Sequence, residues 1–111
     1  MAAKANIVID QGADFSTTLT VTDDAGDAVN LTGYTGTAQL RKHYTSNTST
    51  DFTVSFGTPR TSGELTISIE RGVTSALEAG RYVYDVEITN SANTRSRLVE
   101  GIATITPEVT R

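Results

Sequence analysis

The stretch that decides the fold is Leu77-Glu78-Ala79-Gly80-Arg81-Tyr82-Val83-Tyr84-Asp85-Val86-Glu87-Ile88. Its second half largely alternates apolar and polar residues, which is typical of a strand with one face in a core. Its first half places Leu77, Gly80 and Tyr82 at the spacing of a tyrosine corner, in which the tyrosine hydroxyl hydrogen-bonds to upstream backbone. Such a corner lies where the chain of a Greek-key β-sandwich crosses between its two sheets. The stretch therefore predicts a fold and leaves the function open.

Further segments on either side of this stretch alternate with the same period of two, which predicts strands over residues 5–10, 15–21, 37–44, 52–56, 65–70 and 95–106. Turn residues separate the segments every eight to twelve positions. We expect residues 52–56 to form a hairpin with the preceding strand, and one helical turn over 72–77 with Val73, Ala76 and Leu77 on the core. A glycine interrupts the apolar pattern of the last segment, so a β-bulge is expected at Glu100 to Gly101.

These patterns together predict an all-β chain of seven or eight antiparallel strands in an immunoglobulin-like Greek-key β-sandwich. The length of 111 residues fits a single domain spanning residues 1–111, large enough to bury a core. The composition is 37% hydrophobic and 20% charged, which is enough apolar surface for a folded chain.

Charge and residue usage exclude several classes of function. The net charge of -4 argues against a nucleic-acid partner, because binding to phosphates requires positive charge. Without cysteine, the chain has no disulfide, thiolate zinc site or cysteine nucleophile. Its longest apolar runs are far shorter than a membrane span, and the first residues lack the apolar core of a signal peptide. We expect a protein made in the cytoplasm that does not enter a membrane.

Residues suited to catalysis do not gather in the sequence. His43 is the one histidine, at a strand end where a surface position is expected. Paired carboxylates of the glycosidase kind are available in Asp85, Glu87 and Glu100, but outward carboxylates on a sheet are ordinarily solvated. The acidic segment 23–27 resembles part of a calcium loop but lacks its spacing and its later bidentate glutamate, so a hairpin turn explains it. We therefore expect no enzyme activity, no cofactor and no metal.

Two tyrosines are the exception to the inward placement of the aromatic residues. Tyr34 and Tyr44 fall outside the predicted inner faces, and either is a candidate contact residue or a ring packed over the edge of the core. Arg95, Arg97 and Arg111 add positive charge near the end of the chain, and pairing with cross-strand acids such as Glu87 is expected.

Three parts of the chain, taken in order, resemble the small immunoglobulin-like modules of tailed bacteriophages: Ile9-Asp10-Gln11-Gly12-Ala13-Asp14-Phe15; Asp24-Ala25-Gly26-Asp27-Ala28-Val29-Asn30-Leu31-Thr32-Gly33-Tyr34; and Gly80-Arg81-Tyr82-Val83-Tyr84-Asp85-Val86 with the segment from Glu100 to Arg111. Such modules are found at the start of baseplate upper proteins and in short virion proteins of marine phages. The resemblance implies a mechanical role without catalysis, in a baseplate, tail or head lattice of a virion assembled in the host cytoplasm. The implied partners are other virion proteins and further copies of the chain.

Longer members continue into a fibre or receptor-binding region at the point where this sequence ends, so a stand-alone adaptor or decoration subunit is expected. Unpaired strand edges dock by strand addition. The terminal segments carry no turn signals, and we predict an interface formed by Asn6, Ile7, Val8, Ile9 and Asp10 together with Pro107, Glu108, Val109, Thr110 and Arg111. The alternative function is a module that binds host surface carbohydrate through Tyr34, Tyr44 and the loop Thr45 to Asp51.

Overall fold

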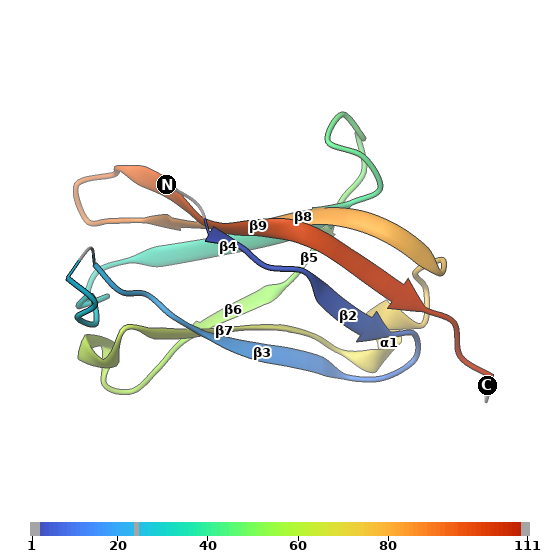
Figure 1. Cartoon of the computed structure of the whole chain (residues 1–111), viewed down its shortest axis with the longest axis horizontal. Coiled ribbons are helices and arrows are strands. Elements are labelled where there is room, and N and C mark those ends of the chain that lie inside the picture. Colours follow the sequence, from blue (N-terminus) through green and yellow to red (C-terminus); the bar gives the residue numbers. More distant parts are fainter. Residues whose placement is uncertain (1–2, 24, 110–111) are drawn as a thin grey trace.

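Two β-sheets stacked face to face form the computed structural model, which describes residues 3–23 and 25–109 (Figure 1). The larger sheet has the order β1-β9-β8-β4-β5, with β2 also paired to β9, and the smaller has the order β3-β7-β6. The strands are β1 (Ala3–Lys4), β2 (Ile7–Asp10), β3 (Phe15–Thr20), β4 (Thr35–Arg41), β5 (Thr50–Asp51), β6 (Thr53–Phe56), β7 (Glu64–Ile69), β8 (Gly80–Thr89) and β9 (Arg95–Thr106). Since β1 and β2 are two halves of one interrupted edge, these segments amount to eight strands, as predicted.

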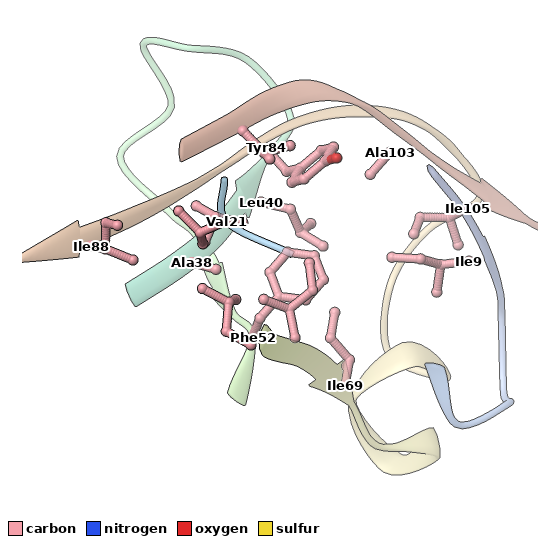
Figure 2. Close-up of a cluster of buried hydrophobic side chains, with 14 of the residues drawn as sticks. Ile9, Val21, Ala38, Leu40, Phe52, Ile69, Tyr84, Ile88, Ala103 and Ile105 are labelled. Atoms are coloured by element: carbon pink, nitrogen blue, oxygen red, sulfur yellow. The ribbon is translucent and has the colours of Figure 1, made fainter. Parts of the chain in front are cut away.

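The core lies between the sheets and is built from the inward residues of the alternating segments. Figure 2 shows side chains from both sheets pointing toward one another. Their burial confirms the predicted inner faces; the fully buried aliphatic side chains include Ile9, Leu31, Leu40, Leu65, Ile67, Val86 and Ile105.

A short helix and a turn of 3-10 helix close the two ends of the sandwich. Helix α1 (Arg71–Thr74) covers the end near the start of β3, and the 3-10 turn spans Arg60–Ser62. The predicted helical turn is present, and Val73 and Leu77 pack against the core. Ala76 is exposed, so its predicted core position is wrong. Thr74 is buried in its place and donates its hydroxyl to the carbonyl of Ala13 at 2.8 Å.

The first edge of the larger sheet runs parallel to β9, which corrects the prediction of an all-antiparallel sandwich. Ile7 pairs with Ala103 and Asp10 pairs with Thr106 in a parallel register. Alternation of apolar and polar residues fixes which face of a strand is buried but carries no information on strand direction. The other ladders are antiparallel.

The segment after the 45–51 loop crosses between the sheets, so the predicted hairpin is only partly right. Two residues, Thr50 and Asp51, pair with β4, and the next strand, β6, pairs with β7 in the other sheet. Phe52 lies at the crossing, with its N–H donated to the carbonyl of Ala38 at 2.9 Å and its ring buried. Burial of this ring between the sheets holds the crossing in place.

A β-bulge is present in the last strand, but at Leu98 and not at Glu100 to Gly101. Val86 pairs with Val99 while Glu87 pairs with Arg97, which leaves Leu98 as the extra residue. Gly101 has another role, because a Cβ at this position would overlap the carbonyl oxygen of Ala5. The glycine therefore permits the first edge to lie close against β9.

Candidate functional site

The predicted terminal interface lies along the outer edge of the larger sheet, where β2 and the end of β9 run side by side (Figure 1). Ile7 and Ile9 face the core, and Ile9 is fully buried, so it contacts no partner in the folded chain. The carboxylate of Asp10 accepts a hydrogen bond from the Thr106 hydroxyl at 2.7 Å. Only Val8 presents an apolar side chain to solvent from this strand, with 61% of its surface exposed.

The tail after β9 stays against the sheet for two residues and then leaves it. The N–H of Glu108 donates to the side-chain oxygen of Gln11 at 3.1 Å, and the Glu108 carboxylate lies over Gly12. Val109 is 94% exposed. Thr110 and Arg111, which the prediction included, lie outside the described residues. A further apolar residue, Ile102 of β9, is exposed on the same outer face as Val8 and was missed.

The tyrosine corner has the expected geometry. The Tyr82 hydroxyl donates to the backbone carbonyl of Glu78 at 2.9 Å. Gly80 has a φ of 136°, which L side chains rarely adopt, and the carbonyl of Leu77 accepts from the Gln11 side chain at 2.7 Å. The corner thus connects the start of β8 to the turn after β2. The ammonium of Lys42 lies over the Tyr82 ring, 4.8 Å from its centroid.

Replacing Tyr82 by phenylalanine is expected to lower the free energy of unfolding by about 1 kcal/mol, because one hydrogen bond is lost. Burial, and then the charge of Glu78, raise the pKa of Tyr82 above its usual 10.0. A raised pKa means that this group's contribution to stability is full below pH 10 and is lost as the pH rises through the folded-state value. Urea unfolding between pH 8 and 11 measures both effects, and the alkaline loss should be shallower in Tyr82→Phe. An equally steep loss in the variant would contradict the assignment to Tyr82.

A polar groove of about 260 Å³ lies on the outer face of the larger sheet, over β4, β8 and β9. Its lining residues are Gln39, Arg41, Tyr44, Val83, Tyr84, Asp85, Glu87, Arg97 and Glu100. Tyr44, from the loop after β4, is 79% exposed beside it. Aromatic, amide, guanidinium and carboxylate groups therefore converge on one surface.

The charges in the groove are arranged around Arg97. Its guanidinium lies 3.3 Å from the Asp85 carboxylate and 2.9 Å from that of Glu100. Burial raises the pKa of Asp85, the charge of Glu87 raises it further, and Arg97 opposes both. The expected pairing of Arg97 with a cross-strand acid is confirmed, but the acid is Asp85. Glu87, the example named from the sequence, lies directly opposite Arg97 and is not its ion-pair partner.

The carboxylates at this groove are held as ion-pair partners more than as a free catalytic pair. Asp85 lies directly opposite Glu100, and Arg97 joins their side chains. The Arg41 guanidinium donates to the Gln39 side chain at 3.1 Å and to the carbonyl of Ser46 at 2.7 Å, which ties the 45–51 loop to the sheet. These contacts suit a surface that binds a polar partner.

Several other sequence-predicted residues are placed apart from the groove. Tyr34 is half-buried and packs against the core. His43 is exposed in the loop after β4. Asp23 accepts hydrogen bonds from the N–H groups of Ala25 and Asp27, as in a capped turn. Within residues 3–23 and 25–109, no cluster of three acidic or histidine side chains is placed to hold a metal ion, and no helix is long and apolar enough to cross a membrane.

The architecture defines the class of the protein as an immunoglobulin-like β-sandwich. A solved structure described as "Structure-based site-directed photo-crosslinking analyses of multimeric cell-adhesive interactions of VGSC beta subunits" is similar with a TM-score of 0.51 and 13% identity, covering 93% of this chain and 92% of that chain. At this identity the likeness concerns the fold alone. No protein-family model matches the chain, and no curated protein matches it.

Proposed function

We propose that this chain is a non-catalytic structural protein of a phage virion, an adaptor or decoration module of the baseplate, tail or head. The observation that carries the proposal is where the exposed apolar side chains gather. In the described part of the chain, the large hydrophobic residues exposed to solvent are Val8, Tyr44, Ile102 and Val109. All but Tyr44 lie on β2, β9 or the tail.

Val8 and Ile102 occupy the same outer face on neighbouring strands, since Val8 pairs with Thr104, two residues beyond Ile102. Side chains at such diagonal positions lie roughly 7 Å apart and form one contact surface. Exposed apolar residues next to a free strand edge suit docking against another protein. The outer edge of β2 is therefore the surface that we assign to contacts with other virion proteins.

Particle composition tests the proposal directly. Tailed phage particles that encode this chain are purified on a density gradient. Peptide mass spectrometry of the gradient fractions then measures whether this chain co-migrates with the capsid protein. A fixed copy number relative to the capsid protein is the expected result. Absence of the chain from particles that contain the other structural proteins would overturn the proposal.

Replacing Val8 by lysine is expected to reduce incorporation into particles by about tenfold, because a charge enters the apolar centre of the docking surface. The matched control is Thr37→Lys, an exposed position on β4 of the same sheet. Quantitative mass spectrometry of particles assembled in the presence of each variant gives the ratio. Equal incorporation of Val8→Lys and wild type would place the contact elsewhere.

The groove beside Tyr44 favours a second candidate, a module that binds host surface carbohydrate. An exposed tyrosine next to charged and amide groups offers a sugar both a flat apolar face and hydrogen-bonding partners. Under this alternative, Tyr44→Ala weakens glycan binding at least about tenfold, while Tyr34→Phe leaves it unchanged. Glycan arrays and titration calorimetry measure the effect. No binding to any glycan of a broad array would exclude this alternative.

A further inference from the structure

Among the described residues, the longest strand at the margin of a sheet is β3, in the smaller sheet. It has 6 residues, compared with 4 in β2, 4 in β6 and 2 in β5. It pairs along its whole length with β7, and among the described residues no strand pairs with its other side. Proteins protect such edges with charges, prolines or bulges, and residues 15–20 contain none of these.

The free backbone groups of β3 belong to its even-numbered residues. Val21, just beyond the strand, donates its N–H to the carbonyl of Gly63 on the β7 side at 2.7 Å. In an antiparallel ladder, alternate residues bond to the same neighbour, so odd-numbered residues face β7. Ser16, Thr18 and Thr20 therefore direct their N–H and C=O groups to the open edge.

The strand is symmetric in polarity about Thr17. Phe15 and Leu19 are the half-buried apolar residues of its inner face, and Ser16 and Thr18 are exposed hydroxyl residues of its outer face. When β3 pairs antiparallel with β3 of a second copy about Thr17, Phe15 of one copy lies opposite Leu19 of the other. Ser16 of one copy likewise lies opposite Thr18 of the other. Apolar side chains then meet apolar ones, and hydroxyls meet hydroxyls.

We infer that the β3 edge pairs antiparallel with β3 of a second copy of this chain, about a twofold axis at Thr17. The pairs of Ser16 with Thr18 exchange about four backbone hydrogen bonds across the axis. The outer hydroxyl row, in which Thr18 already bonds to Thr66 at 2.9 Å, then continues into the second copy. The smaller sheets of the two molecules form one continuous sheet.

The charges around β3 are compatible with a second copy of the chain at this edge. Asp14, next to the strand, lies opposite Thr20 of the second copy in this register, so like charges do not face one another across the new ladder. Each copy still carries a net charge of -4, which repels the other at long range. The dimer is therefore expected to tighten as salt rises from 0.05 to about 0.5 M, because salt screens that repulsion.

This dimer does not depend on the proposed function, because it is inferred from the fold alone. It can be tested with the purified protein. Sedimentation across a concentration series measures dimerisation of wild type, Thr18→Pro and Thr18→Val. Proline removes the N–H that points to the open edge while leaving the ladder to β7, so it should weaken the dimer at least about tenfold. Thr18→Val keeps the N–H and should dimerise like wild type. Circular dichroism checks that each variant is folded.

Cysteine pairs test the register, because a side-chain substitution leaves the backbone ladder in place. The chain has no native cysteine, so each crosslink can be assigned to the introduced pair. An equimolar mixture of Ser16→Cys and Thr18→Cys places two Cβ atoms opposite one another at disulfide distance. It should give at least about tenfold more crosslinked heterodimer than Ser55→Cys with Thr18→Cys, in which Ser55 is also exposed but lies on β6. A monomer at millimolar concentration in high salt, or equal crosslinking of both mixtures, would overturn the inference. Neither outcome bears on whether particles contain the chain.

Discussion

Replacing Gly101 with alanine is expected to lower the free energy of unfolding by about 2–3 kcal/mol, the range for overpacking at a closely packed site. The new Cβ would overlap the carbonyl oxygen of Ala5, which is fixed on both sides. The N–H of Ala5 donates to the carbonyl of Glu100 at 2.9 Å, and its carbonyl accepts from the buried Tyr84 hydroxyl at 2.6 Å. The first edge must therefore move away from β9 or distort the strand.

Chemical unfolding of Gly101→Ala measures this loss, with Gly72→Ala as the matched control. A Cβ at Gly72 meets only the Glu70 carboxylate oxygen at 3.9 Å, so alanine there should be neutral or slightly stabilising. The variant Tyr84→Phe adds a test of mechanism, because both changes act on the contact with Ala5. Combined, they should destabilise by less than their sum. Full additivity would show that Gly101→Ala acts elsewhere.

The fold could be predicted because the alternation of apolar and polar residues that defines each strand is a local property of the sequence. Alternation at Leu65, Ile67 and Ile69, or at Tyr84, Val86 and Ile88, places one face of each strand in the core whatever its neighbours are. The tyrosine corner likewise follows from short-range spacing. Pairing direction and neighbour order are set by long-range contacts, so the parallel first edge could not be predicted.

Glycine in the last strand illustrates a different limit. A glycine within a strand indicates either a bulge or the close approach of another backbone, and the sequence does not distinguish them. At Gly101 the cause is Ala5, which is far away in the chain. The true bulge, at Leu98, is hidden because Leu98 and Val99 are both apolar. The displaced register places Arg97 directly opposite Glu87, yet the ion pairs of Arg97 are with Asp85 and Glu100.

The candidate contact surface could be predicted only in part. The terminal segments were identified by position, and Val8 and Val109 are indeed exposed. Ile9 belongs to the predicted surface by its position in the chain, although its alternation with Val8 indicates an inward side chain. Ile102 was missed, although counting outward from Ala103 would have placed it on the outer face. The free edge of β3 depends on sheet order, which the alternation of its residues does not contain.

Replacing Phe52 with alanine is expected to cost about 3–5 kcal/mol, the range for removing a buried phenylalanine. Phe52 is 5% exposed at the point where the chain leaves the larger sheet for the smaller one. Its ring centroid lies 6.4 Å from that of Phe15 and 6.1 Å from that of Tyr84, so it connects an aromatic ring of each sheet. Figure 2 shows Phe52 and Tyr84 within the core. Such tilted pairs add to the apolar area that the ring buries.

Two controls separate burial of the Phe52 ring from the strand crossing itself. Thr53→Ala alters the next, exposed position and should change the free energy of unfolding by less than about 0.5 kcal/mol. Phe52→Leu keeps an apolar side chain and should recover more than half of the loss, since most of the cost of alanine is the cavity. Denaturant unfolding followed by circular dichroism gives the three values. A loss for Phe52→Ala no larger than that for Thr53→Ala would mean that the crossing holds through its backbone bond to Ala38 and not through this ring.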